Sequence, residues 1–152
     1  MTRQRQRDAP LGPFSEWHRD TMPSWYTYID IDYTGYIDPK QWPQFGYELY
    51  MFVELIHIPN DGVWGPDIAS RYPLHDHKRE VYKSLEQSTA IPVFVVWHNH
   101  SCTEFVIQRL GSEELTTNYY DDWGGLADVF DRVRESRIEQ LQRRASGGVM
   151  ND

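Results

Sequence analysis

Cysteine is nearly absent from this 152-residue chain, which contains Cys102 alone and therefore cannot form an internal disulfide. A lone thiol of this kind fits a reducing compartment. No stretch approaches the roughly 18 apolar residues that a membrane-spanning helix needs. The basic residues 1–7 are not followed by the apolar segment of a secretory signal. These absences predict a cytoplasmic protein that has no membrane partner.

Positive charge is the minority charge, because 15 Lys and Arg residues stand against 23 Asp and Glu residues, a net charge of −8. General binding to polyanions depends on basic residues that neutralise phosphates, so this composition argues against it. The acidic excess does not exclude an enzyme that reaches nucleic acid through metal ions and a local basic patch. The chain also lacks a Walker-type phosphate loop, a dinucleotide-binding fingerprint and a Gly-x-Ser-x-Gly elbow.

The residues that are present are those of a folded domain, with 39% hydrophobic and 14% aromatic side chains. A chain of this length suits one domain with a real core. We predict a flexible basic arm over residues 1–12, a single domain over 13–144 and a disordered tail over 145–152.

Helical and strand-like patterns alternate along the predicted domain. Hydrophobic periodicity and turn residues predict helices over 14–21, 74–87 and 123–143, and strands over 25–37, 47–58, 91–97 and 104–110. Paired early strands followed by a helical crossover indicate an α/β fold, in which a central mixed β-sheet is flanked by helices.

Glu54 lies inside the most apolar run of the chain, Tyr47 to Ile58. An ionised carboxylate in such a strand is costly unless it is paired, hydrogen-bonded or bound to a metal. The residue therefore either bonds to an arginine or a backbone amide at the end of the sheet, or belongs to a chemical site.

Asp30 and Asp32 pose the same question on the preceding strand, where they alternate onto one face. On a solvated face they need no partner. If they point towards Glu54, the converging carboxylates repel one another, and a divalent cation is the usual reason to assemble them. Hard oxygen ligands favour Mg²⁺ or Mn²⁺.

The arrangement of these acids resembles the PD-(D/E)XK nuclease superfamily over about two thirds of the chain, from Phe14 to Leu110. Residues 29–33, Ile-Asp-Ile-Asp-Tyr, resemble the first acidic motif, and residues 52–56, Phe-Val-Glu-Leu-Ile, resemble the second. The resemblance implies a restriction-endonuclease-like core and metal-dependent hydrolysis of DNA phosphodiester bonds.

The resemblance also implies roles for single residues. Asp32, or less directly Asp30, would bind the metal ion, Glu54 would be the second carboxylate ligand, and the backbone carbonyl of Leu55 would complete the protein ligands. Glu16 on the first predicted helix is a further acid of the kind that some members use.

The lysine of the family motif is missing, because Ile56 stands two residues after Glu54. Lys78 on the following helix is the first candidate to replace it, and His77 and His57 are further candidates. The alternative is a catalytically inactive relative that acts as an acidic binding or regulatory partner of a nucleic-acid enzyme.

Histidine pairs offer another interpretation, a zinc or iron site. The residues concerned are His18, His57, His75, His77, His98 and His100. Trp42 and Trp64 fall in predicted loops, where an aromatic ring suits contact with a nucleic-acid base. DNA is the predicted partner, and the sequence leaves the oligomeric state open, a homodimer included.

Overall fold

The structure is a computed structural model of the chain, and it describes residues 31–59, 62–111 and 116–147. The chain divides into two compact units, residues 1–30 and 31–152. All structural statements below concern the second unit. The predicted arm, the predicted helix over 14–21, Glu16, His18 and Asp30 lie outside the described residues.

The described unit contains a five-stranded sheet in the order β1-β2-β3-β4-β5, in which only β2 and β3 pair in parallel. The elements in chain order are β1 (Tyr33–Tyr36), β2 (Leu49–Ile58), α2 (Ile68–Arg71), α3 (Asp76–Thr89), β3 (Val93–Asn99), β4 (Phe105–Arg109), β5 (Thr117–Tyr120) and α4 (Trp123–Gly147). This mixed sheet with flanking helices confirms the predicted α/β fold class.

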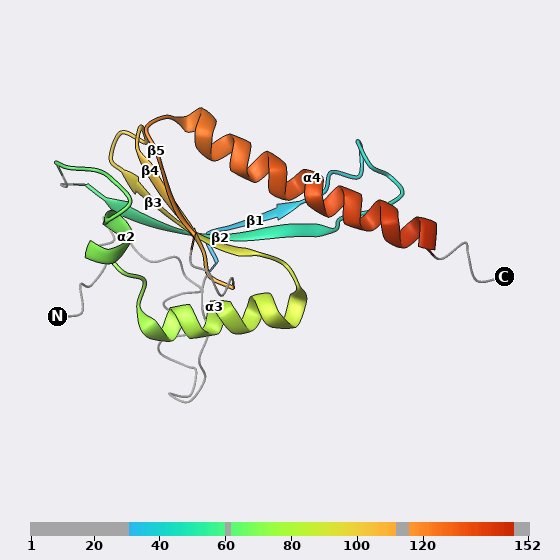
Figure 1. Cartoon of the computed structure of the whole chain (residues 1–152). Coiled ribbons are helices and arrows are strands. Elements are labelled where there is room, and N and C mark those ends of the chain that lie inside the picture. Colours follow the sequence, from blue (N-terminus) through green and yellow to red (C-terminus); the bar gives the residue numbers. More distant parts are fainter. Residues whose placement is uncertain (1–30, 60–61, 112–115, 148–152) are drawn as a thin grey trace, which may run out of the picture. The chain divides into compact units, whose positions relative to one another are not determined.

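The two long helices lie on opposite faces of the sheet, with α4 on one side and α3 on the other (Figure 1). Side chains that alternate along the strands form the core under α4. That core consists of Met51, Val53, Phe94, Val96, Phe105, Ile107 and Leu126. The intervening residues of β2, β3 and β4 therefore face α3, and Glu54 is one of them.

The crossover between β2 and β3 follows the local sequence closely. Helix α3 ends at Thr89, and the residue after it, Ala90, takes a left-handed backbone conformation with φ of 56°. Pro92 then precedes β3, as predicted from its missing amide proton, and its carbonyl accepts a hydrogen bond from Phe52 N at 3.0 Å. A parallel strand pair needs such a crossover, and here it places the inner side of α3 over Glu54.

The element predictions need correction in several places. Within the described residues the predicted strand over 25–37 is strand only at Tyr33–Tyr36. The short elements α2 and β5 were not predicted, and α4 continues to Gly147, beyond its predicted end at Arg143. No helix in the described part of the chain is long and apolar enough to cross a membrane.

Candidate active site on the α3 face of the sheet

Glu54 is buried between β2 and α3, with 2% of its surface exposed. Its Oε1 atom accepts a hydrogen bond from Lys78 Nζ at 2.6 Å, and its Oε2 atom accepts one from the Tyr82 hydroxyl at 2.8 Å. Both contacts offset part of the cost of burying the carboxylate. Of the three basic residues proposed for this position, the structure brings Lys78 to Glu54.

The two partners of Glu54 belong to a row of polar side chains along one side of helix α3. Lys78, Tyr82 and Glu86 are four residues apart, so they lie on the same side of the helix, and this side faces the sheet. Tyr82 is fully buried, whereas the Lys78 side chain is 31% exposed and reaches Glu54 from the edge of the interface. The ion pair is therefore open to solvent on its Lys78 side.

Glu86 fixes the far end of this row on α3 to the sheet. It is 7% exposed, and its carboxylate accepts hydrogen bonds from Arg109 Nε at 2.8 Å, Val93 N at 3.0 Å and Gly111 N at 3.1 Å. A Cβ atom at position 111 would overlap this carboxylate, so the close approach requires glycine. Glu86 was not predicted as part of the site, although it lies four residues after Tyr82 on the same side of the helix.

A row of polar side chains crosses the sheet beside Glu54. The strand register runs from Glu54 through Val95 and Gln108 to Thr117, so all four residues share the α3 face. Gln108 is buried, accepts a hydrogen bond from Arg79 Nη1 at 3.3 Å and donates one to Thr117 at 3.0 Å. The interface between α3 and the sheet is therefore more polar than that under α4.

Asp32 lies next to this row, at the start of β1. Tyr33 pairs with Val53, so one further step of the antiparallel register brings Asp32 to Glu54. The Asp32 side chain is exposed, and its Oδ2 atom accepts a hydrogen bond from Leu55 N at 2.8 Å. In a strand the amide and carbonyl of one residue point to the same side, so the Leu55 carbonyl also faces the β1 side. The Asp32 carboxylate and the Leu55 backbone thus lie next to each other.

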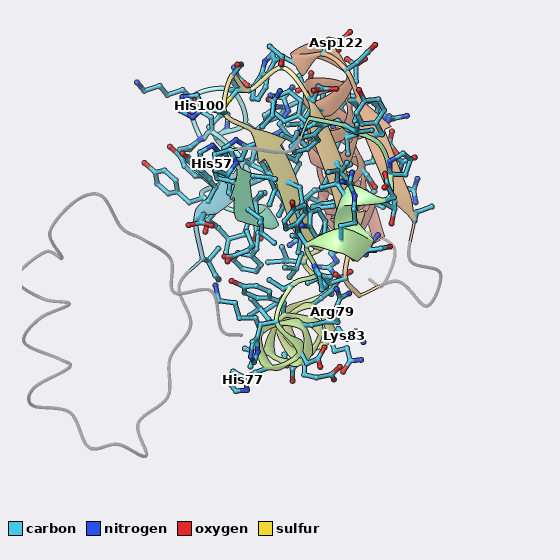
Figure 2. The ribbon with its side chains drawn as sticks, turned by 90° about the vertical axis from the view of Figure 1, so that its left-hand side faces the viewer. His57, His77, Arg79, Lys83, His100 and Asp122 are labelled. Carbon is cyan, nitrogen blue, oxygen red and sulfur yellow. The ribbon has the colours of Figure 1, made fainter. Side chains whose placement is uncertain are left out.

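The other two candidates for the missing lysine lie elsewhere. His77 is exposed on the side of α3 that points away from the sheet (Figure 2). His57 lies on β2 among other histidines, with ring centroids 5.0 Å from His98 and 5.4 Å from His100. Packing against these rings and the charges of His98 and His100 lower the pKa of His57. Neither His77 nor His57 takes the position beside Glu54 that Lys78 occupies.

The histidines do not form the predicted zinc or iron site in the described part of the chain. The rings of His57 and His98 stack with planes 11° apart, so their nitrogens lie in parallel planes and do not converge. Among the described residues no group of three His, Cys, Asp or Glu side chains is placed to hold a metal ion.

The two loop tryptophans are partly buried. Trp42 stacks on Phe45, with ring centroids 5.8 Å apart and planes 18° apart. Both rings pack against a second small core formed by Ile37, Ile138 and Leu141. Trp42 therefore has a packing role in this part of the fold.

Comparison with protein-family models gave no match, and comparisons with curated proteins and with solved structures gave none either. The resemblance to the PD-(D/E)XK nucleases therefore stays a prediction from the sequence motifs.

Proposed function

We propose that this protein is a divalent-metal-dependent nuclease that hydrolyses DNA phosphodiester bonds, with a PD-(D/E)XK-type site at Asp32, Glu54 and Lys78. The observation that carries the proposal is the 2.6 Å contact between Lys78 Nζ and Glu54 Oε1. This contact supplies, from the following helix, the ammonium group that the second acidic motif lacks.

The residues present fit a hard divalent ion such as Mg²⁺ or Mn²⁺. Asp32 offers an exposed carboxylate just before β1, the strand next to β2, and the amide of Leu55 donates a hydrogen bond to it. Carboxylate and backbone carbonyl oxygens are ligands that these ions prefer. Asp32, Glu54 and the Leu55 carbonyl would hold the ion. When bound, such an ion polarises a phosphate and makes an attacking water more acidic.

Each protein group has a separate task in this proposal. Lys78 offsets negative charge beside Glu54 and orients a water through its remaining ammonium protons. Tyr82 fixes the Glu54 carboxylate from the side opposite Lys78, because it donates to the other oxygen. Leu55 N restricts Asp32 to one orientation. Preorganised groups of this kind avoid reorganisation during the reaction.

A second candidate function is a catalytically inactive nuclease fold that acts as an acidic regulatory partner of a nucleic-acid enzyme. It is favoured by the engagement of both Glu54 oxygens, since Lys78 and Tyr82 already satisfy this buried carboxylate without a metal ion. The excess of 23 acidic over 15 basic residues also favours this function.

Cleavage assays on matched variants test the first proposal. Plasmid and single-stranded DNA are incubated with Mn²⁺ and wild-type protein, Glu54→Gln, Lys78→Met or Lys83→Met. Lys83→Met is the matched control, because Lys83 lies on the same helix and pairs only loosely with Glu80 at 3.4 Å. We expect cleavage to be lost in Glu54→Gln, to fall at least about 100-fold in Lys78→Met, and to persist in Lys83→Met.

Circular dichroism of each variant is the control that distinguishes a loss of cleavage from a loss of folded structure. Metal-dependent cleavage that persists in folded Glu54→Gln would overturn the assignment of this site. Absence of cleavage in the wild type with Mn²⁺ and with Mg²⁺ would reject the nuclease and leave the regulatory function.

A further inference from the structure

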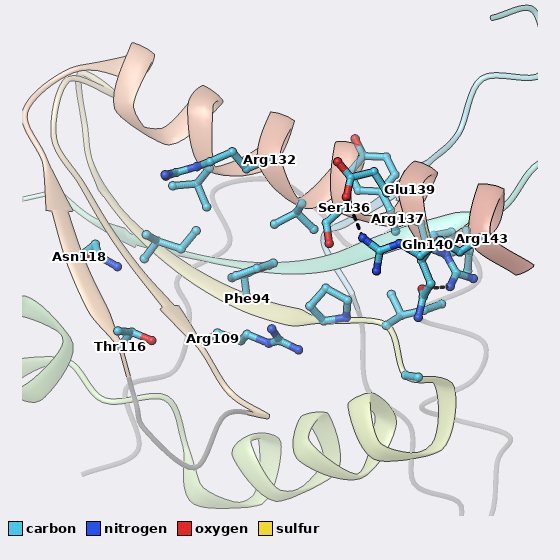
Figure 3. A pocket seen from close by; sticks show the side chains of 18 residues that line it. Phe94, Arg109, Thr116, Asn118, Arg132, Ser136, Arg137, Glu139, Gln140 and Arg143 are labelled. Atoms are coloured by element: carbon cyan, nitrogen blue, oxygen red, sulfur yellow. Dashed lines mark hydrogen bonds and ion pairs between the residues drawn. The ribbon is translucent and has the colours of Figure 1, made fainter. Parts of the chain in front are cut away.

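A groove with a cavity volume of about 570 Å³ lies between α4 and the sheet, on the face opposite Glu54 (Figure 3). Tyr50, Phe94 and Ile107 contribute its apolar floor, and Val129 and Val133 contribute the α4 wall. A volume of this size lies within the range of roughly 300–1,000 Å³ that is typical of ligand sites.

The charge of the groove is opposite to that of the whole chain. Its charged lining residues are Arg109, Arg132, Arg137, Arg143 and Glu139. The protein as a whole carries a net charge of −8. A basic groove in an acidic protein attracts an anionic ligand locally while the remaining surface repels it.

Two of the arginines stabilise the fold. Arg137 donates to Leu49 O at 3.2 Å and to Glu48 Oε2 at 3.1 Å, which joins α4 to the start of β2. Arg109 forms the ion pair with Glu86 described above. These two guanidinium groups are held in place at the groove.

The other two arginines are available to a ligand. Arg143 is 81% exposed and has only a 3.4 Å ion pair with exposed Glu139. Arg132 is exposed, and no hydrogen bond or ion pair joins it to another residue in the described ranges. A ligand therefore gains contacts here without breaking a buried interaction.

The spacing of these two arginines indicates an extended ligand. Arg132 and Arg143 are three helical turns apart, so they share one side of α4 and are separated by about 16 Å along its axis. Figure 3 shows Arg132 and Arg143 towards the two ends of the groove, with Ser136 and Gln140 between them. Two separated cations with neutral donors between them suit a chain of linked phosphates better than a single compact ion.

We infer that this groove binds a short stretch of single-stranded nucleotides through its phosphodiesters. Guanidinium groups suit phosphate because they donate two parallel hydrogen bonds to it. The apolar floor accommodates bases, and side chains such as Asn118 supply donors and acceptors for base edges. The inference is independent of the proposed nuclease site, since it needs neither a metal ion nor Glu54.

Fluorescence anisotropy tests the groove directly. The probe is a fluorescein-labelled oligothymidine of about twelve nucleotides, titrated with the full chain in EDTA so that no cleavage occurs. The variants are the double variant Arg132→Ala with Arg143→Ala, and Arg144→Ala. Arg144 is the matched control, because it is an exposed arginine on the same helix that does not line the groove.

We expect the double variant to bind about tenfold or more weakly. The slope of the logarithm of the binding constant against the logarithm of the salt concentration should be shallower by about 1.4, or about 0.7 for each lost phosphate contact. Arg144→Ala should bind as the wild type does. No binding to the wild type, or equal binding by the wild type and the double variant, would overturn the inference. Displacement of the probe by an equally charged polyglutamate peptide would also overturn it, because the groove would then select charge alone.

Competition with the 5′-phosphorylated thymidine dinucleotide shows whether the groove binds free dinucleotides as well as longer strands. Displacement would assign free dinucleotides as well as strands to the groove, and lack of displacement would restrict it to strands; both results support the inference. Binding measured in Glu54→Gln separates the two proposals. Retained binding with lost cleavage leaves both in place, whereas retained binding with unchanged cleavage removes only the nuclease site.

Discussion

Replacement of Lys78 by methionine tests whether the Glu54–Lys78 ion pair behaves as a buried interaction. Methionine keeps an unbranched apolar stem of similar length, so the change mainly removes the charge. Glu54 is 2% exposed and would keep only the Tyr82 hydroxyl as its partner among the contacts described above. The carboxylate then lies in the interior without the ammonium group of Lys78.

The magnitude follows from the burial of the two side chains. Removal of one partner of a fully buried ion pair costs about 3–5 kcal/mol. Lys78 is 31% exposed, and solvent screens its side of the pair, so we expect a loss of about 2–3 kcal/mol in the free energy of unfolding. Lys83→Met, which removes an exposed pair, should cost about 0.5 kcal/mol or less.

Urea denaturation followed by circular dichroism measures both values, provided that the slope of the transition is unchanged. Adding Glu54→Gln to Lys78→Met removes the buried charge and should restore most of the lost stability, because Gln still accepts from Tyr82. A cost for Lys78→Met no larger than that of Lys83→Met would refute the reasoning. So would a double variant less stable than Lys78→Met alone.

Two other changes probe the edge strand and the histidine cluster. Gly35→Ala should lower the free energy of unfolding by about 1–3 kcal/mol, because the added Cβ would lie 2.7 Å from the Tyr50 ring; a neutral result in urea denaturation would contradict this packing. The pKa of His57 lies below its ordinary value of 6.5 in the folded protein, so the unfolded chain binds more protons as the pH falls through that value. Stability should therefore fall from about pH 7 to about pH 5, and it should fall less steeply in His57→Gln. Thermal melts in which the melting temperatures of the wild type and of His57→Gln change equally with pH would contradict the role of His57.

The elements that the sequence predicted well are those with a strong local signal. The strands β2 and β3 are dense in apolar and β-branched residues, and α4 carries a regular apolar stripe. The strand β5 was not predicted because Thr117–Tyr120 is short and polar. These residues form a strand only because they pair with β4. The short helix α2 has too few residues for a periodic signal.

Some residues of the candidate site likewise have a local sequence signal, and others do not. Glu54 was recognisable because a charge inside an apolar strand requires a partner. Lys78 was proposed through the family resemblance only as the replacement for the missing lysine, and its ion pair with Glu54 was not predicted. Glu86 was missed because an acid near the end of an amphipathic helix looks like a surface residue. Its three hydrogen-bonding partners come from β3, β4 and the segment after β4, and only the folded chain brings them together.

The basic groove also could not be predicted from the sequence, because the fold brings its lining residues together. Its arginines come from β4 and from α4, and in the sequence the arginines of residues 123–147 look like one solvated helix surface. Only the packing of α4 against the sheet separates Arg132 and Arg143, which line the groove, from Arg144, which does not.

The single parallel pairing in the sheet has a consequence for how the protein folds. The meander β3-β4-β5 joins strands that are neighbours in the sequence, whereas α2 and α3 both lie between β2 and β3. Closing that longer loop costs more chain entropy, which favours early formation of the meander and later docking of β2. The Glu54–Lys78 contact joins β2 to the connection that follows it, so it belongs to the late stage of assembly, when β2 and α3 come together on a sheet that is already partly built.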